Sequence, residues 1–320
     1  MKQLLDTAQK IKSMEIRGAG KIARTAAAHL RDYSQRQTSG DISQFNDKMK
    51  IAAELLISTR PTAVSLPNAV HSVMRYVGET VEEAKNDIDK RANYFIENSE
   101  NAVKKIGEIG AKRIRDGDTI MTHCNSSAAI SIIAAAHKEG KNIKVIATES
   151  RPRWQGHLTI KQLDDEGIRT SLIVDSAVRY FMKDVDIVVM GADAVTANGS
   201  VINKIGTSQL ALCAHEARKN VIIAAETYKF SPRSLLGDLI EIEERSSCEV
   251  ISDEKLKGYM HVSVKNPAFD VTPREYIDLI CTEVGAIPPE MAYIIIKEHL
   301  GYSLDDINYN GKRKGSNQKY

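Results

Sequence analysis

The sequence predicts an α/β protein in which a helical N-terminal domain is followed by a doubly wound, parallel β-sheet domain. The first third of the chain carries apolar residues at helical spacing throughout. From residue 117 onward, short runs rich in Ile and Val alternate with segments of helical pattern, as in a parallel sheet. Polar side chains follow these apolar runs where the predicted strands end, which indicates a ligand site at the carboxyl edge of the sheet.

The N-terminal third is predicted to be helical because its apolar residues recur every three to four positions. The pattern runs through KIARTAAAHLRDYSQ and DKMKIAAELLIST, with breaks at 38–41 and 60–70. Residues 80–114 then form one long amphipathic pattern, which we interpret as a helix that leads into the next unit. We place the helical domain at 1–108 and the sheet domain at 109–320.

The remainder of the chain predicts strands and helices in alternation. Five apolar runs are the expected strands: DTIMTHC, NIKVIATES, RTSLIVD, DIVVMGAD and NVIIAAET. The expected helices lie at 126–139, 154–167, 176–184 and 203–218. A sixth unit adds a strand near 276–282 and a helix opened by Pro288 and Pro289. The polar stretch 310–320 is predicted to be a frayed basic tail.

Composition excludes several classes of protein. A chain of 320 residues with 42% hydrophobic and 27% charged residues fits a globular protein with a sizeable core. The net charge of +2 gives no electrostatic case for nucleic acid. No apolar run approaches the ~20 residues that span a bilayer, and the N-terminus lacks the apolar stretch of a signal peptide. Four scattered cysteines without a CxxC pair argue against structural zinc and disulfides, so we expect a cytoplasmic protein that binds neither nucleic acid nor membrane.

A cysteine stands at the predicted corner between the first strand and the helix after it. Cys124 lies in MTHCNSSAAI, where an apolar run stops and a small-residue run begins. Free cysteines are usually buried as small hydrophobes, whereas a helix N-terminus lowers a thiol pKa and favours the thiolate. The motif by itself leaves both interpretations open. His123 beside it is assigned to packing or to support of the site.

Polar residues also follow the other predicted strands. Glu149 and Arg151 follow the second, Asp175 the third, Asp193 the fourth and Lys229 the fifth. Parallel strands end at one edge of a sheet, so we expect these side chains to share that edge. Burial beside the strand end would raise the pKa of the Asp193 carboxyl and make it an acid. Capping of the following turn is the alternative.

A glycine-containing segment near the N-terminus is a candidate anion site. In RGAGKIARTAA, Gly18 and Gly20 open a predicted helix whose backbone N–H groups, together with Arg17, can bind a phosphate. The alternative is a simple capped loop. A dinucleotide fingerprint is excluded because no strand precedes the glycines.

Further candidate phosphate donors lie elsewhere in the chain. Asn203 and Lys204 are predicted to open a helix, and Lys229 follows the fifth strand. Arg60 precedes a rigid proline-containing turn, for which a solvated surface arginine is the alternative interpretation.

Seven motifs in this order resemble those of the archaeal ribose-1,5-bisphosphate isomerases: RGAGKIA, RPTAVSLPNAV, THCNSSAAI, TESRPRWQG, VMGADAVTANGSVINKIGT, AAETYKF and NPAFDVTP. That family belongs with the methylthioribose-1-phosphate isomerases and with the alpha, beta and delta regulatory subunits of eukaryotic translation initiation factor 2B. The resemblance extends from about Arg17 to about Leu300. It implies a Rossmann-like sheet domain behind the helical domain, and a homohexamer built as a trimer of dimers.

The resemblance also implies an activity and a site. The activity is conversion of ribose 1,5-bisphosphate to ribulose 1,5-bisphosphate, in a route that carries AMP-derived ribose to Rubisco, with AMP as a candidate effector. Cys124 is implied as the base and Asp193 as the acid, with no metal or redox cofactor. The implied substrate-binding residues are Arg17, Gly18, Ala19, Gly20, Arg60, Ser126, Ser127, Ala128, Asn203, Lys204 and Lys229. Ser127 stands where the family usually has lysine, so one cation near the substrate is lost.

Two other functions remain open at this point. A methylthioribose-1-phosphate isomerase would use the same Cys124 and Asp193, but its substrate has one phosphate, whereas the chain offers cations for two. A non-catalytic regulatory subunit would bind a nucleotide or sugar phosphate. The presence of both a candidate base and a candidate acid argues against that second alternative.

Overall fold

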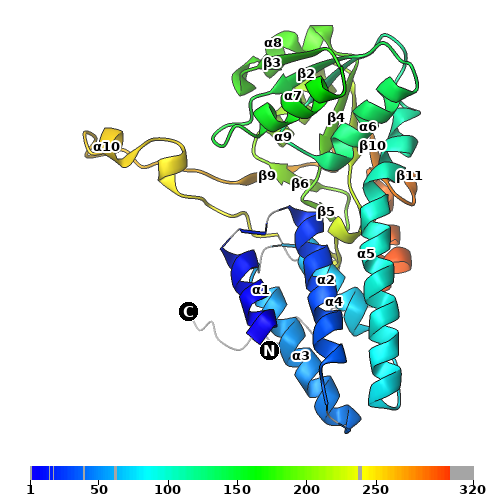
Figure 1. Ribbon diagram of the computed structural model, residues 1–320. Coiled ribbons are helices and arrows are strands. Elements are labelled where there is room, and N and C mark those ends of the chain that lie inside the picture. Colours follow the sequence, from blue (N-terminus) through cyan, green and yellow to red (C-terminus); the bar gives the residue numbers. More distant parts are fainter. Residues whose placement is uncertain are drawn as a thin grey trace. The chain divides into compact units, whose positions relative to one another are not determined.

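The computed structural model describes residues 2–13, 15–16, 18–38, 40–60, 63–236 and 240–302, shown in Figure 1. The chain divides into two compact units, Met1–Ala102 and Val103–Tyr320. Within the described part of the chain, no helix has the length and apolar character needed to cross a membrane.

The first unit is helical, as predicted. Its elements are α1 (Lys2–Lys12), α2 (Ala19–Gln35), α3 (Ile42–Ser58), α4 (Ser65–Met74) and most of α5 (Val81–Ala111). Helix α3 begins where the Asp41 carboxylate accepts a hydrogen bond from the Ser43 N–H at 2.9 Å. The apolar faces of these helices form a core in which Leu30, Phe45 and Leu56 are fully buried.

The second unit is built on a seven-stranded sheet of order β11-β10-β7-β4-β1-β2-β3. The strands are β1 (Thr119–Thr122), β2 (Lys144–Thr148), β3 (Thr170–Ile173), β4 (Ile187–Gly191), β7 (Asn220–Ala224), β10 (Leu279–Thr282) and β11 (Gly285–Ile287). Every pair is parallel except the β10–β11 hairpin. The order of the strands reverses between β1 and β4, so the predicted doubly wound fold is confirmed.

Helices cover both faces of this sheet. The end of α5, α6 (Ser127–Lys138) and α7 (Gln155–Asp165) pack on one face through Ile106, Ile132 and Leu163. On the other face lie α8 (Val178–Phe181), α9 (Thr207–Glu216) and α11 (Ala292–Ile294), with Leu210 and Ala292 in the core. Double coverage explains why β4 is a continuous apolar run with every residue buried.

Short 3₁₀ and π turns complete the second unit. They are η1 (Asp175–Ala177), η2 (Met182–Asp184), η3 (Thr227–Lys229), η4 (Pro232–Leu236), η5 (Ser247–Glu249), η6 (Arg274–Tyr276), η7 (Pro289–Met291) and η8 (Ile295–His299).

A second, four-stranded sheet of order β8-β5-β6-β9 was not predicted. Its strands are β5 (Ala194–Thr196), β6 (Val201–Lys204), β8 (Phe230–Ser231) and β9 (Phe269–Thr272). The prediction that Asn203 and Lys204 open a helix is wrong, because they end β6 and α9 begins only at Thr207. A turn containing Gly199, at φ 88°, lets β6 pair antiparallel with β5, and β9 holds its other edge.

The chain between β8 and β9 leaves the small sheet and returns to it. Figure 1 shows α10 (Asp253–Leu256) at the far end of this segment, in yellow. The two limbs pair at their base, where the Arg245 N–H donates to the Asn266 carbonyl at 2.9 Å and the Ala268 N–H to the Glu243 carbonyl at 2.8 Å. This pairing places residues 243–245 next to the strand that borders Lys204.

Candidate active site

The carboxyl ends of β1 and β4 are neighbours at the point where the strand order reverses. Cys124 follows β1, and Asp193 lies between β4 and β5. Ligands of doubly wound sheets bind beyond the strand ends at such a point. The Asp193 charge acts on the Cys124 thiol, so the two side chains lie close enough to interact.

The backbone at Cys124 is held in an uncommon conformation. Its φ is 64°, in the left-handed region that residues other than glycine rarely adopt. The Cys124 N–H donates to Ser150 Oγ at 2.8 Å, and the Cys124 carbonyl accepts from Thr159 Oγ1 at 2.6 Å. These two contacts turn the chain sharply out of β1 before α6 begins at Ser127.

One of the two interpretations of the motif is a thiol pKa lowered by the helix N-terminus, and the structure contradicts it. Burial raises the pKa of Cys124 to about 11, and the backbone hydrogen bond from Asn125 opposes this only in part. The desolvation of a charged sulfur therefore outweighs the helix terminus. In the folded protein the Cys124 side chain is a neutral thiol at neutral pH.

The Asp193 carboxyl shows the raised pKa that the sequence predicted. Desolvation raises it, against the opposing charges of Lys229 and Lys204. The side chain is open to solvent on one side, while the protein around its other sides removes most of its hydration. The Asp193 N–H donates to the Ile202 carbonyl at 2.9 Å, which ties the residue to the small sheet. Asp193 is thus suited to hold and donate a proton.

Lys229 forms a buried ion pair. Its Nζ lies 2.8 Å from Glu226 Oε2, and Tyr228 donates to Glu226 Oε1 at 3.0 Å. Desolvation lowers the Lys229 pKa, but the Glu226 charge more than offsets it and the pKa is raised. Lys229 therefore stays charged, and its ammonium has three N–H donors, enough to bind Glu226 and an anion together.

Lys204 ends β6 beside a cation that sequence reasoning missed. Its Nζ donates to the Ala268 carbonyl at 3.0 Å and lies 5.0 Å from the centre of the Phe269 ring. Desolvation lowers the Lys204 pKa, and the nearby charge of Arg245 lowers it further. Arg245 also acts on Asp193. No local sequence pattern marks Arg245, because only the pairing of distant segments brings this residue close to Lys204 and Asp193.

Asn203 and the start of α9 are arranged differently from the prediction. The Asn203 amide donates to Thr207 Oγ1 at 2.9 Å. The Asp270 carboxylate accepts from the Gly206 N–H at 2.7 Å and from the Ser208 N–H at 3.1 Å. Desolvation raises the Asp270 pKa to about 6. A carboxylate thus occupies the N-terminus of α9, so a phosphate is better placed elsewhere.

The N-terminus of α6 points its first backbone N–H groups toward the same strand ends. Ser126 caps the helix by accepting from the Ala129 N–H at 3.3 Å, and Ser127 and Ala128 form the first turn. Gly191 at the end of β4 permits this approach, because a Cβ there would lie 2.3 Å from Ser126 Oγ. Unpaired backbone N–H groups at a helix start of this kind can bind an anion.

The remaining predicted residues belong to the first unit. Gly18, at φ 87°, precedes α2 without a side-chain cap, and Ala19 and Gly20 form its first turn. Helix α1, and no strand, comes before them, as predicted. Arg60 follows α3, and its N–H donates to the Ile57 carbonyl at 3.3 Å. Arg17 lies outside the described residues.

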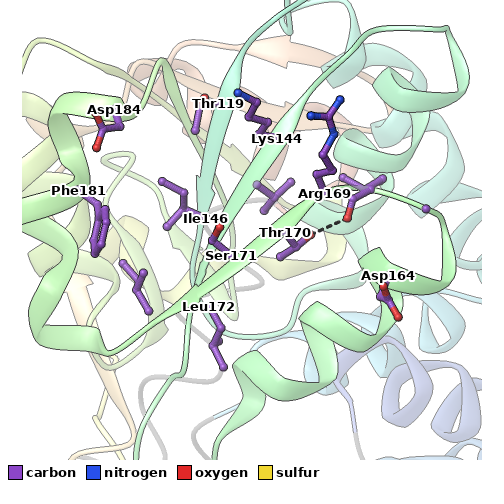
Figure 2. Close-up of a pocket in the computed structure, with 14 residues that line it drawn as sticks. Thr119, Lys144, Ile146, Asp164, Arg169, Thr170, Ser171, Leu172, Phe181 and Asp184 are labelled. Carbon is purple, nitrogen blue, oxygen red and sulfur yellow. Dashed lines mark hydrogen bonds between the residues drawn. The ribbon is translucent and has the colours of Figure 1, made fainter.

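A cavity of about 860 Å³ lies along the edge strand β3 and reaches the first residues of β1 and β2 (Figure 2). Thr119 and Lys144, the first residues of β1 and β2, line it together with Arg169 and Phe181. None of the predicted site residues lines this cavity. Among the described residues there is also no group of three or more His, Cys, Asp or Glu that could hold a metal ion.

Comparison with known proteins gives three findings. The model of the Initiation factor 2 subunit family matches residues 15–289. A ribose 1,5-bisphosphate isomerase from Archaeoglobus fulgidus is 60% identical over 303 residues, which cover 95% of each chain. A methylthioribose-1-phosphate isomerase from Acetivibrio thermocellus is 38% identical over 305 residues, which cover 90% of this chain and 89% of that protein. The crystal structure of translation initiation factor eIF-2B from Pyrococcus horikoshii has a TM-score of 0.75 at 32% identity, covering 90% of this chain and 98% of that chain.

Proposed function

The chain belongs to the Initiation factor 2 subunit family, and on that premise we propose that it is an isomerase converting ribose 1,5-bisphosphate to ribulose 1,5-bisphosphate. One observation carries the proposal: a cysteine and a protonatable aspartate share the carboxyl edge at the reversal of strand order, beside Lys204 and Lys229. A protein that only bound a ligand would have no use for that acid–base pair.

The chemistry follows from the substrate. C1 carries a phosphate, so the ring cannot open as a simple hemiacetal. Asp193 donates its proton to the ring oxygen as the C1–O4 bond breaks, while the Cys124 thiolate takes the proton from C2, which leaves an enol phosphate. The Cys124 thiol then returns a proton to C1, and Asp193 regains one from the C2 hydroxyl as the ketone forms. Both groups end in their starting states.

The two phosphates need separate cationic subsites. We place one at the first turn of α6, within the field of Lys204, Arg245 and Lys229. For the other, the family resemblance implies Arg17, Gly18, Ala19, Gly20 and Arg60 as the binding residues. Methylthioribose 1-phosphate would fill only one of these subsites. Ser127 supplies a hydroxyl where the family usually has lysine, and Arg245 is a cation that can compensate.

The decisive experiment offers the purified protein both sugar phosphates and measures the ketose formed from each. We expect turnover of ribose 1,5-bisphosphate, and a loss of several orders of magnitude in Cys124→Ser, because a serine hydroxyl ionises far less readily than even a thiol whose pKa is raised. Asp193→Asn should bind substrate but fail to open the ring. Cys248→Ser, at an exposed position, is the matched control and should be fully active. Turnover of methylthioribose 1-phosphate alone would select the alternative isomerase.

The phosphate subsites can be tested separately. Arg60→Ala should raise KM for the bisphosphate by losing a charge-assisted contact worth about 1.5–3 kcal/mol. Lys229→Ala is a poor probe because it would leave the buried Glu226 carboxylate without its partner. The double variant Glu226→Gln/Lys229→Met, compared with Glu226→Gln alone, removes the cation without that defect. An unchanged KM in both tests would contradict the two-subsite assignment.

We further propose a cytoplasmic homohexamer built as a trimer of dimers, with AMP as an effector in nucleotide-ribose salvage. The four free cysteines are compatible with a reducing compartment. Sedimentation should give the mass of six chains of 35.4 kDa, and a stable monomer would contradict the assembly. Turnover measured with and without AMP tests the effector.

A further inference from the structure

A buried polar network holds the backbone of Cys124. Its central member is Ser150, which is completely buried and has a φ of 59°. Ser150 Oγ accepts the Cys124 N–H at 2.8 Å. Two residues in the left-handed region, one after β1 and one after β2, are therefore joined by a single hydrogen bond.

Asp175, after β3, fixes Ser150 in turn. Its Oδ1 accepts from the Ser150 N–H at 2.8 Å, and its Oδ2 accepts from the Arg151 N–H at 2.7 Å. One carboxylate thus binds two successive N–H groups of the turn. Hydrogen bonds of this charge-assisted kind are the stronger ones, and they hold Ser150 in a conformation that its own side chain disfavours.

His123 and Thr148 surround the Ser150 hydroxyl with hydrogen-bond acceptors. His123 Nε2 lies 2.8 Å from the Ile205 carbonyl, which can only accept, so Nε2 carries the hydrogen. Burial lowers the pKa of the imidazole, so the ring is neutral and Nδ1 is an acceptor, which Thr148 Oγ1 approaches to 2.6 Å. Ser150 Oγ lies 3.4 Å from both Thr148 Oγ1 and His123 Nδ1. The Thr148 carbonyl, at 3.5 Å, is a third acceptor for the Ser150 hydroxyl. The hydroxyl hydrogen therefore faces these acceptors, and the lone pair of Ser150 Oγ faces the Cys124 N–H.

We propose that Ser150 is a positioning residue, which keeps Cys124 in its left-handed conformation and so holds the thiol at the strand edge beside Asp193. A left-handed residue other than glycine persists only where its surroundings impose that conformation. Displacing a reacting group by about 1 Å can cost roughly 10²-fold in rate. The kinetic consequence rests on the proposed function, whereas the hydrogen bond itself does not.

Ser150→Gly is the sharpest variant. Glycine adopts a φ of 59° without strain, so the substitution removes the hydroxyl and relieves the backbone. We expect kcat to fall about 10- to 100-fold while KM stays within about twofold. Arg218→Gly is the matched control, because Arg218 is exposed and has a φ of 57°, and its kinetics should not change. If Ser150→Gly does not fold, Asp175→Asn, which retains one of the two acceptor oxygens, should show a smaller loss of kcat.

Hydrogen exchange of the Cys124 amide, followed by mass spectrometry, separates this inference from the proposed function. Faster exchange in Ser150→Gly supports the hydrogen bond as the element that holds Cys124, even if the wild type turns over neither sugar phosphate. Unchanged exchange overturns the proposal. Faster exchange with unchanged kcat in an active enzyme also overturns it, as does a loss of kcat that only matches the loss of folded protein.

Discussion

At the scale of single residues, the candidate site is defined by two acidic groups whose pKa values are both raised by desolvation. Desolvation raises the pKa of Cys124 to about 11 and also raises that of Asp193. The reactive pair, a thiolate with a carboxylic acid, carries the same one proton as the ground-state pair of thiol and carboxylate. In the proposed mechanism the reactive pair is therefore a minor protonation state, and its population has the same pH dependence as that of the ground-state pair.

This pair predicts a broad bell-shaped dependence of kcat/KM on pH. The acidic limb reports Asp193, and the alkaline limb lies near pH 11, where Cys124 loses its proton in the free enzyme. Alkylation of Cys124 by iodoacetamide should accelerate about tenfold per pH unit between pH 7 and 10, because only the thiolate reacts. Mass spectrometry of the Cys124 peptide measures this rate, with exposed Cys248 as internal reference. A plateau reached below pH 8 would contradict the raised pKa.

At the scale of secondary-structure elements, the site depends on the close approach of α6 to β4. The last residue of β4 is Gly191, and Ser126 lies directly against it. The contact sets where the first turn of α6 meets the strand ends. The identity of residue 191 is thus constrained by a helix that is distant from it in the sequence.

Gly191→Ala should displace Ser126 and the start of α6, because the added Cβ would lie 2.3 Å from Ser126 Oγ. We expect a loss of about 1–3 kcal/mol in the free energy of unfolding, together with weaker substrate binding. Denaturant unfolding measures the first quantity and KM the second. Gly40→Ala is the control, because a Cβ there meets nothing within 4 Å. Adding Ser126→Gly to Gly191→Ala should recover part of the stability, and no recovery would show that the conflict lies elsewhere.

At the scale of the whole molecule, the small sheet assembles the site from segments that are far apart in the sequence. Lys204 comes from β6, Lys229 from the turn before β8, and Arg245 from the segment that pairs beside β9. They surround Asp193, whose ionisation is opposed by desolvation and favoured by the lysines. Desolvation outweighs the attraction of the lysines, so the Asp193 pKa is raised and the stability of the fold depends on pH.

Asp193→Asn should stabilise the protein increasingly as the pH rises. A carboxyl whose pKa is raised on folding contributes most below its unfolded pKa, and that contribution is lost as the pH rises through the folded value. The asparagine variant does not ionise, so its melting temperature should exceed that of the wild type by a margin that grows from pH 4 to pH 8. Thermal unfolding of both proteins across that range checks the sign. A margin that shrinks with pH would mean that Asp193 is stabilised as the carboxylate.

Local sequence patterns were sufficient for the architecture of the main sheet. Apolar runs predicted the six parallel strands, although not the antiparallel edge strand β11, and residues 80–114 predicted the helix that the structure shows as α5. The position of Cys124 and Asp193 after their strands also followed from the sequence, because parallel strands end at one edge. These inferences succeed because hydrophobic periodicity and strand polarity are properties of short segments.

Tertiary structure alone decided the rest. Asn203 and Lys204 became part of a strand because β9, more than 60 residues away, pairs with β6. Arg245 reaches the site, and Ser150 holds Cys124, through contacts between segments that no local pattern connects. The thiol pKa rose where the helix terminus predicted a fall, because desolvation depends on everything packed around the sulfur. Periodicity is encoded along the chain, whereas pairing partners and burial are set only when distant parts of it meet.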